Sequence, residues 1–127
     1  MDTPDELLYS SDHEWVRKET DNRIRVGITD FAQDALGDIV YVELPVVGTI
    51  AELNKSISEV ESTKSVSDIY APLPGTIIEV NEDLNEAPEK INSDPYGDGW
   101  LFVLELTQDQ SLDSLLDSKS YLDLTEA

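Results

Sequence analysis

The chain has 127 residues and carries 28 Asp and Glu against 8 Lys and Arg, a formal net charge of −20 at pH 7. Such a charge repels phosphate backbones and anionic lipids, so we expect neither nucleic-acid nor membrane binding. The absence of cysteine excludes disulfide scaffolds, thiolate zinc sites and cysteine nucleophiles. A hydrophobic content of 39% is sufficient for a folded core, and the length predicts one domain.

The sequence carries no targeting or membrane signal that we recognise. Its longest uncharged stretch, residues 69–78, is too short for a membrane helix. Residues 1–6 are acidic, whereas secretory and organelle signals begin with basic or Arg-rich segments. We therefore expect a soluble, cytoplasmic protein.

A β-hairpin is predicted for residues 14–19 and 23–28. The second stretch alternates Ile or Val with a polar residue or glycine, which is typical of a strand with one buried face. Polar residues 20–22 are expected to form the turn between the two strands.

A short helix and a strand are predicted next. Residues 29–37 favour one or two helical turns, with Asp30 as the N-cap, Gln33 three residues later, and Gly37 at the left-handed position that ends a helix. Residues 39–44 are β-branched or aromatic almost without interruption. This composition predicts a strand that is buried on both faces.

A faint internal repeat marks the middle of the chain. The tripeptide Gly-Thr-Ile at 48–50 recurs at 75–77, and an acidic residue follows each copy at the same spacing. Two related β units on either side of residues 61–65 would place that segment at the tip of a hairpin. The repeat therefore predicts an exposed turn at 61–65.

The last third of the chain mixes loop, strand and helix signals. Residues 85–99 are rich in Pro and Gly and predict loops with a helical turn, and residues 100–106 predict the last strand. Leucines at helical spacing over 112–116 and apolar residues over 121–124 predict one or two short amphipathic helices lying on a sheet.

Two features suggest chemistry at first sight. His13 is the only histidine, but Asp12 and Glu14 beside it would point to the opposite face of a strand, so we interpret His13 as structural or surface-exposed. Residues 94–105 nearly match a calcium-binding loop, yet Tyr96 stands where an oxygen ligand is required and a strand is predicted to follow. We therefore predict a tight turn there. Serine-hydrolase and nucleotide-binding motifs are absent, so the residues alone indicate no catalytic apparatus.

Lys64 lies in the predicted hairpin tip, with hydroxyl side chains at positions 62, 63, 65 and 67. It is the only basic residue between Lys55 and Lys90. A lysine on an exposed tip among small residues is accessible to an enzyme, which a covalently modified carrier requires. The other interpretation, which composition by itself favours, is an ordinary solvated lysine.

A series of motifs follows in one order along the chain: HEWV (13–16), VGITD (26–30), GDIVYVELP (37–45), ESTK (61–64), SDIYAP (67–72), GTI (75–77), VN (80–81), NSDPYGDGW (92–100) and LL (115–116) before Tyr121. This ordered set resembles the H-protein family of the glycine cleavage system, whose members are lipoyl carriers. The resemblance covers the chain from about Tyr9 to Tyr121, which we take as the core of a single lipoyl-carrier domain spanning residues 1–127.

The resemblance implies a mainly β fold, a barrel-sandwich hybrid of the lipoyl- and biotinyl-carrier kind, with short helices that include a C-terminal one. It implies lipoate attached covalently to Lys64 through an amide, with Glu61 and Ser62 in the motif read by lipoylating enzymes. Glu14 and Asp68 match acidic positions of a cleft that holds the amine of the loaded arm.

The resemblance also implies a role as a non-catalytic carrier subunit. The carrier takes the aminomethyl group of glycine from a pyridoxal-phosphate-dependent glycine decarboxylase (P protein) to a tetrahydrofolate-dependent aminomethyltransferase (T protein). It passes reducing equivalents to dihydrolipoamide dehydrogenase (L protein), and a lipoate ligase or lipoyltransferase loads it. A tethered arm raises the effective concentration of the cargo at each enzyme.

Some positions depart from the family pattern. Thr63 and Ser65 stand where relatives usually have Val and Ala, Ala35 stands where many have His, and Asp12 replaces a commonly smaller residue. These departures bear on docking of the arm, whereas Lys64 and the Glu-Ser pair before it are intact.

Three alternative functions remain at this point. The first is an H-like protein that serves lipoate transfer to other enzymes. The second is a biotin carrier, which is disfavoured because Thr63 and Ser65 replace the two methionines that flank a biotinyl lysine. The third is a binding module without a cofactor, against which the intact lysine motif argues.

Overall fold

The computed structural model describes residues 3–20, 22–53, 55–107 and 112–126. Met1, Asp2 and Asp21, which contributed to the predictions for the N-terminus and the first turn, lie outside these ranges. The strands are β1 (Leu8–Tyr9), β2 (Glu14–Thr20), β3 (Arg23–Ile28), β4 (Ile39–Glu43), β5 (Ile50–Ala51), β6 (Ser56–Ser62), β7 (Val66–Tyr70), β8 (Gly75–Val80) and β9 (Phe102–Leu106).

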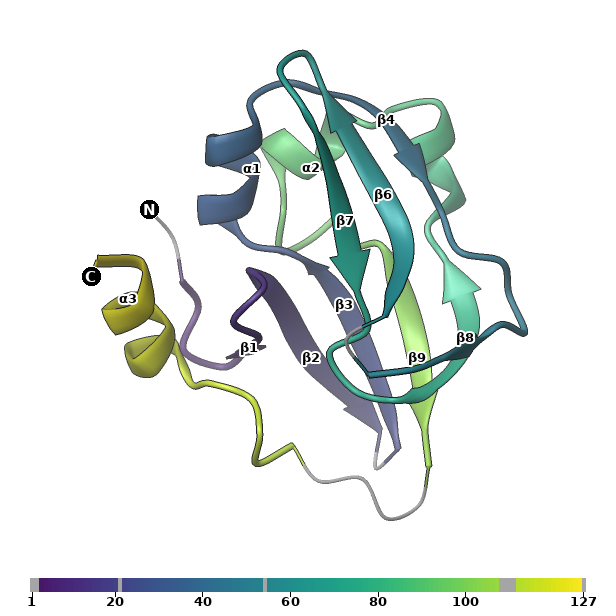
Figure 1. Ribbon diagram of the computed structural model, residues 1–127, viewed down its shortest axis with the longest axis vertical. Helices are drawn as coiled ribbons and strands as arrows, with labels where there is room; N and C mark the ends of the chain where they lie inside the picture. The colour runs from purple at the N-terminus through teal and green to yellow at the C-terminus, as the bar shows by residue number, and fades with distance from the viewer. Residues whose placement is uncertain (1–2, 21, 54, 108–111, 127) are drawn as a thin grey trace.

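Two antiparallel sheets organise these strands (Figure 1). The larger sheet has six strands in the order β1–β2–β3–β9–β8–β5, and the smaller has three in the order β4–β6–β7. The helices are short: α1 (Asp30–Leu36), α2 (Lys90–Ser93), α3 (Ser118–Glu126) and a 3-10 helix (Glu82–Asn85). Within the described part of the chain, no helix is long and apolar enough to cross a membrane.

The predicted β2–β3 hairpin is confirmed. The two strands pair antiparallel, and the alternating Ile and Val residues of β3 are buried. Gly27 lies between them and is also buried, because the Trp15 ring covers it: a Cβ at Gly27 would lie 2.6 Å from ring atoms. The hairpin therefore contributes to the core on one face and packs an aromatic ring on the other.

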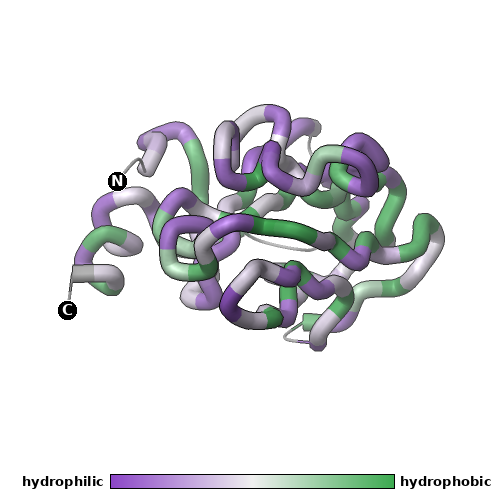
Figure 2. The backbone as a smooth tube through the Cα atoms, turned by 90° about the horizontal axis from the view of Figure 1, so that it is seen from above, coloured by the Kyte–Doolittle hydropathy of each residue, from purple (hydrophilic) through white to green (hydrophobic). Residues whose placement is uncertain are grey.

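The inner faces of the two sheets enclose the main apolar core. Figure 2 shows a hydrophobic stretch of chain running through the middle of the molecule. The smaller sheet contributes Val42, Val60 and Ile69, all at most 3% exposed. Leu84 of the 3-10 helix and Ile91 of α2 fill the same cluster. These two side chains hold the loop-rich segment before β9 against the core.

The prediction that residues 39–44 are buried on both faces is wrong. Val40 is 54% exposed and Tyr41 is 52% exposed, whereas Ile39 and Val42 are buried. A register irregularity between Ile39 and Tyr41 interrupts the simple alternation. The physical reason is that the smaller sheet packs on the core with one face only, so its other face meets solvent.

Helix α1 begins at a different cap from the one predicted. Thr29 is the N-cap, and its Oγ1 accepts the N–H of Ala32 at 3.2 Å. Asp30 lies one residue inside the helix, where its Oδ1 accepts a bond from Nε2 of Gln33 at 2.7 Å. Gly37 ends the helix with φ 83°, as predicted.

Of the one or two helices predicted for the tail, the one around residues 121–124 is confirmed as α3, whereas the segment 112–116 is not helical. Leu116 instead exchanges two backbone hydrogen bonds with Tyr9, at 2.7 and 2.8 Å, and forms a bridge beside β1. Helix α3 follows and lies next to β1 (Figure 1). The leucines pack partly against the core, and their spacing alone could not distinguish a helix from this bridge.

Tyr121 anchors α3 to the larger sheet. Its ring stacks on Tyr9, with centroids 4.7 Å apart. Its buried hydroxyl lies 2.7 Å from Oγ1 of Thr29 and 2.8 Å from Nδ1 of His13. Because this network engages the His13 ring, the structural interpretation of His13 fits the geometry.

Replacing Tyr121 with Phe keeps the ring and removes only this hydroxyl. We expect Tyr121→Phe to lower the free energy of unfolding by about 1–3 kcal/mol, because the buried hydroxyl of Thr29 and the partly buried ring of His13 each lose a hydrogen-bond partner. Urea unfolding measures the change. Tyr41→Phe is the control, since that side chain is half-exposed, and it should change the value by less than about 0.5 kcal/mol. Equal losses in both variants would contradict the anchoring role.

Candidate functional site

The β6–β7 hairpin presents Lys64 at its exposed tip, as the repeat predicted. In Figure 1 the tip lies at the same end of the molecule as α1 and α2. Ser62 shapes the turn: its N–H donates to the carbonyl of Ser65 at 2.8 Å, and its Oγ accepts the N–H groups of Lys64 and Ser65, both at 3.1 Å. The serine before the lysine therefore holds the turn in one conformation, a local function that the sequence did not reveal.

Glu61 lies on the outer face of the smaller sheet, beside the turn. Side chains on this face form two rows that run across the three strands. The row nearer the tip contains one carboxylate and two exposed apolar side chains, and the other row contains three carboxylates. The rows are Tyr41–Glu61–Val66 and Glu43–Glu59–Asp68. The three strands contain no Lys or Arg. All charged side chains on this face are therefore acidic, so the face attracts cationic surfaces.

Glu14 starts β2 and is only 1% exposed. Its Oε2 accepts the N–H of Tyr70 at 2.8 Å, and its Oε1 accepts the hydroxyl of Ser10 at 3.1 Å. Through Tyr70 the carboxyl connects the larger sheet to β7, which is an edge strand of the smaller sheet. Glu14 is thus a polar link between the two sheets.

Burial raises the pKa of the Glu14 carboxyl from 4.5 to about 8, although the bonds from Tyr70 and Ser10 act in the opposite direction. The carboxyl is therefore mostly protonated near neutral pH. A cation within hydrogen-bonding distance would favour the carboxylate and lower this pKa.

Asp68, the second predicted cleft residue, lies on the outer face of β7. Its side chain is exposed, and its Oδ1 accepts the hydroxyl of Ser56 at 3.2 Å. Asp68 and Tyr70 lie two and four residues along β7 from Val66, about 7 and 13 Å at ~3.3 Å per residue. Glu14 approaches β7 at its edge, through Tyr70, whereas Asp68 lies two residues earlier with its side chain on the outer face.

An open groove of about 540 Å³ lies toward the other end of the hairpin. It is lined by the end of β4, the segment that follows it, and the start of β6, including Glu43, Val46, Ile50, Lys55 and Ser58. Lys64, Glu14 and Asp68 do not line this groove. The groove is therefore separate from the predicted cleft for the arm.

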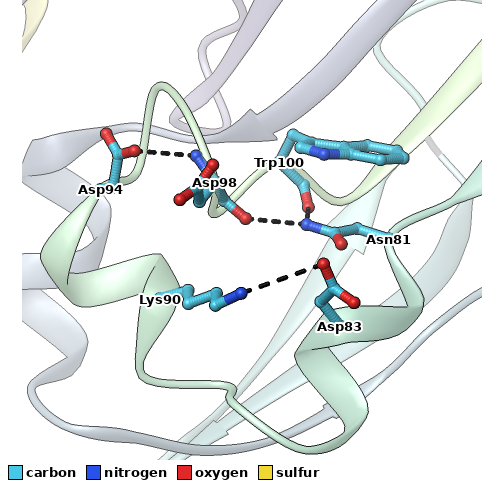
Figure 3. A network of polar contacts seen from close by, with 6 residues as sticks. All are labelled: Asn81, Asp83, Lys90, Asp94, Asp98 and Trp100. Carbon is cyan, nitrogen blue, oxygen red and sulfur yellow. Dashed lines mark hydrogen bonds and ion pairs between the residues drawn. The ribbon is translucent and has the colours of Figure 1, made fainter.

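The segment that nearly matches a calcium loop is a hydrogen-bonded turn (Figure 3). Oδ2 of Asp94 accepts the N–H of Asp98 at 2.9 Å, and Nδ2 of Asn81 donates to the carbonyls of Asp98 and Trp100, both at 2.8 Å. Glu105 forms an ion pair with an arginine of β3 at 3.3 Å. Across the described ranges, no group of three or more His, Cys, Asp or Glu is placed to hold a metal ion.

Known proteins resemble this chain along almost its whole length. The model of the glycine cleavage H-protein family matches residues 7–127. The chain belongs to this family. A glycine cleavage system H protein from Nocardia farcinica (strain IFM 10152) is 55% identical over 123 residues, covering 94% of this chain and 93% of that protein. One from Mycobacterium tuberculosis (strain H37Rv) is 49% identical over 126 residues, covering 94% of each.

Solved structures agree with these matches. The crystal structure of a glycine cleavage system H protein from Mycobacterium marinum matches with a TM-score of 0.87 at 41% identity, covering 98% of this chain and 99% of that chain. This match and the two sheets with short helices, including the C-terminal α3, confirm the predicted fold class, a mainly β barrel-sandwich hybrid.

Glu14→Gln tests the buried carboxyl. Because the folded-state pKa is raised above 4.5, the folded protein holds a proton that the unfolded chain releases, so stability falls as pH rises from about 4.5 to about 8. Glutamine keeps an oxygen for the N–H of Tyr70 and does not titrate.

We expect the wild type to lose unfolding free energy relative to Glu14→Gln between pH 5 and 8, on the order of a few kcal/mol. Urea unfolding at intervals of one pH unit measures the difference. Two curves that run parallel over this range would show that Glu14 titrates normally.

Proposed function

We propose that the protein is the lipoyl-bearing carrier of a glycine cleavage system, with lipoate joined through an amide to Nζ of Lys64. The observation that carries this proposal is the exposed Lys64 turn, closed by Ser62, in a chain that matches the H-protein family from residue 7 to residue 127. The names of the relatives favour glycine cleavage over a role in lipoate transfer to other enzymes.

The turn is suited to covalent modification. Lys64 is exposed, and its neighbours Thr63 and Ser65 are small, so an active site can close around the amine. Acylation removes the ammonium charge. When attached, lipoate supplies a dithiolane that carries the aminomethyl group and the reducing equivalents.

We expect Glu14 and Asp68 to hold the amine of the loaded arm over the edge of β7. The pKa of Glu14, about 8 without a cation, falls when an ammonium lies beside it, because the opposite charge favours the carboxylate. Docking of the arm at neutral pH therefore releases a proton from Glu14. Asp68 adds a second carboxylate on the exposed side of the same strand.

The chain acts in this proposal as a non-catalytic carrier that visits several enzymes. These are glycine decarboxylase, aminomethyltransferase, dihydrolipoamide dehydrogenase, and the lipoate ligase or lipoyltransferase that loads Lys64. The four carboxylates on the outer face of the smaller sheet, within a net charge of −20, favour encounters with enzymes that have basic residues around the active-site entrance.

Lys64→Arg tests the attachment site. Incubation of the wild type with lipoate, ATP and a lipoate ligase should increase its intact mass by one lipoyl group, and Lys64→Arg should abolish the increase. Lys55→Arg, at another exposed lysine, is the matched control and should be modified as fully as the wild type. A wild-type chain that stays unmodified would refute the proposal.

Salt dependence tests the role of the acidity. We expect kcat/KM for aminomethyltransferase acting on the loaded protein to fall by roughly fivefold or more between 50 and 500 mM NaCl, because salt screens long-range attraction. Free lipoamide, loaded in the same way, lacks the acidic chain and should show a much smaller change. Equal salt dependence for both substrates would leave the charge without a role in docking.

A further inference from the structure

The side chain of Lys64 lies against the backbone at Gly37, where α1 ends and the chain turns into β4. A Cβ at Gly37 would lie 2.8 Å from Cε of Lys64 and 3.5 Å from Nζ. Gly37 also has φ 83°, a conformation that residues with a side chain rarely adopt. The backbone angle therefore favours glycine at this position, and an alanine Cβ there would displace the flexible end of the Lys64 side chain.

Asn92 of α2 holds this corner in place. Its Nδ2 donates to the carbonyl of Gly37 and to Oε1 of Gln33, both at 2.9 Å. Its Oδ1 accepts the N–H of Ile39 at 2.9 Å. One side chain thus binds the backbone on both sides of Asp38, and the orientation of residues 37–39 depends on it.

The lysine turn is tied to the same corner through its backbone. The N–H of Thr63 donates to the carbonyl of Asp38 at 3.1 Å. The residue before Lys64 and the side chain of Lys64 itself therefore both rest on residues 37–39. Movement of this corner would change the direction in which the amine points.

We propose that Gly37 and Asn92 are positioning residues for the acylation of Lys64, and this inference rests on the proposed function of Lys64 as the attachment site. Residues 37–39, held by Asn92, support the aliphatic part of the Lys64 side chain. We call this supporting segment the shelf. A restricted side chain presents Nζ in fewer directions and loses less freedom when it enters an active site.

The step concerned is amide formation with an activated lipoyl group, an anhydride or ester supplied by the attaching enzyme. The neutral amine of Lys64 attacks the acyl carbon, the C–N bond forms as the bond to the leaving group breaks, and Nζ gives up one proton. No redox change occurs. The chain contributes the nucleophile and its direction.

The primary test compares the rates at which the variants Gly37→Ala and Gly48→Ala are acylated. Both glycines have positive φ, 83° and 95°, but a Cβ at Gly48 meets nothing within 4 Å. Acylation by a lipoate ligase is followed by intact mass over a range of chain concentrations. Gly37→Ala should lower kcat roughly tenfold with little change in KM, because the amine is misdirected in the bound complex. Gly48→Ala should stay within about twofold of the wild type.

Asn92→Asp is the second variant. It keeps an oxygen for the N–H of Ile39 but loses both donated bonds, so kcat should again fall while KM is maintained. If Asn92 had only a structural role, Asn92→Asp would reduce the folded fraction in urea unfolding, and kcat would not fall separately from KM.

A third measurement needs no variant and no modification. In the unmodified wild type, a nuclear Overhauser effect between the ε protons of Lys64 and the α protons of Gly37 should be observed. Absence of this effect would contradict the proposal that the shelf supports Lys64, even if Gly37→Ala fails to fold.

The outcomes separate this inference from the proposed function. A wild-type chain that is never acylated at Lys64 would refute the proposed function, and the shelf with it as a positioning device. A wild-type chain that is acylated, while Gly37→Ala matches Gly48→Ala, would overturn the shelf alone.

Discussion

The packing of the β6–β7 hairpin on the core is the constraint on which the rest of the structure depends. Val60 and Ile69 face inward from the two strands and are at most 3% exposed. Because side chains alternate along a strand, burying these residues turns Glu61 and Asp68 outward and carries the turn with Lys64 beyond the core. The same alternation thus produces both the anchor of the hairpin and its acidic, solvent-facing side.

Hydrogen bonds add to the apolar core in positioning the β6–β7 hairpin. Apolar packing is non-directional, so it holds the hairpin against the larger sheet without defining the position of its tip. Glu14 binds β7 at Tyr70, and the corner around Asp38 binds the turn at Thr63. Directional hydrogen bonds at both ends of the hairpin therefore place Lys64 relative to α1 and β2.

Glu14 shows that a buried carboxyl can reduce stability. Ionising it inside the protein is unfavourable, which is why its pKa is raised to about 8. A surface carboxylate would carry its charge without this cost, but it would also attract every cation in solution. In the proposed carrier role, a buried carboxyl that ionises only when an amine lies beside it would distinguish the loaded arm from bulk salt.

The sequence by itself determined the family, most of the strands and the exposed position of Lys64, because these depend on local alternation, turn residues and the order of motifs. The tertiary structure alone decided that β4 has a solvent face, that 112–116 bridges to Tyr9, that Glu14 is buried, and that Gly37 lies under Lys64. Each of these depends on residues far apart in the chain, or on which face of an element meets the core. Local patterns carry no record of such contacts, since burial, hydrogen-bond partners and pKa values arise only when the two sheets and the helices come together.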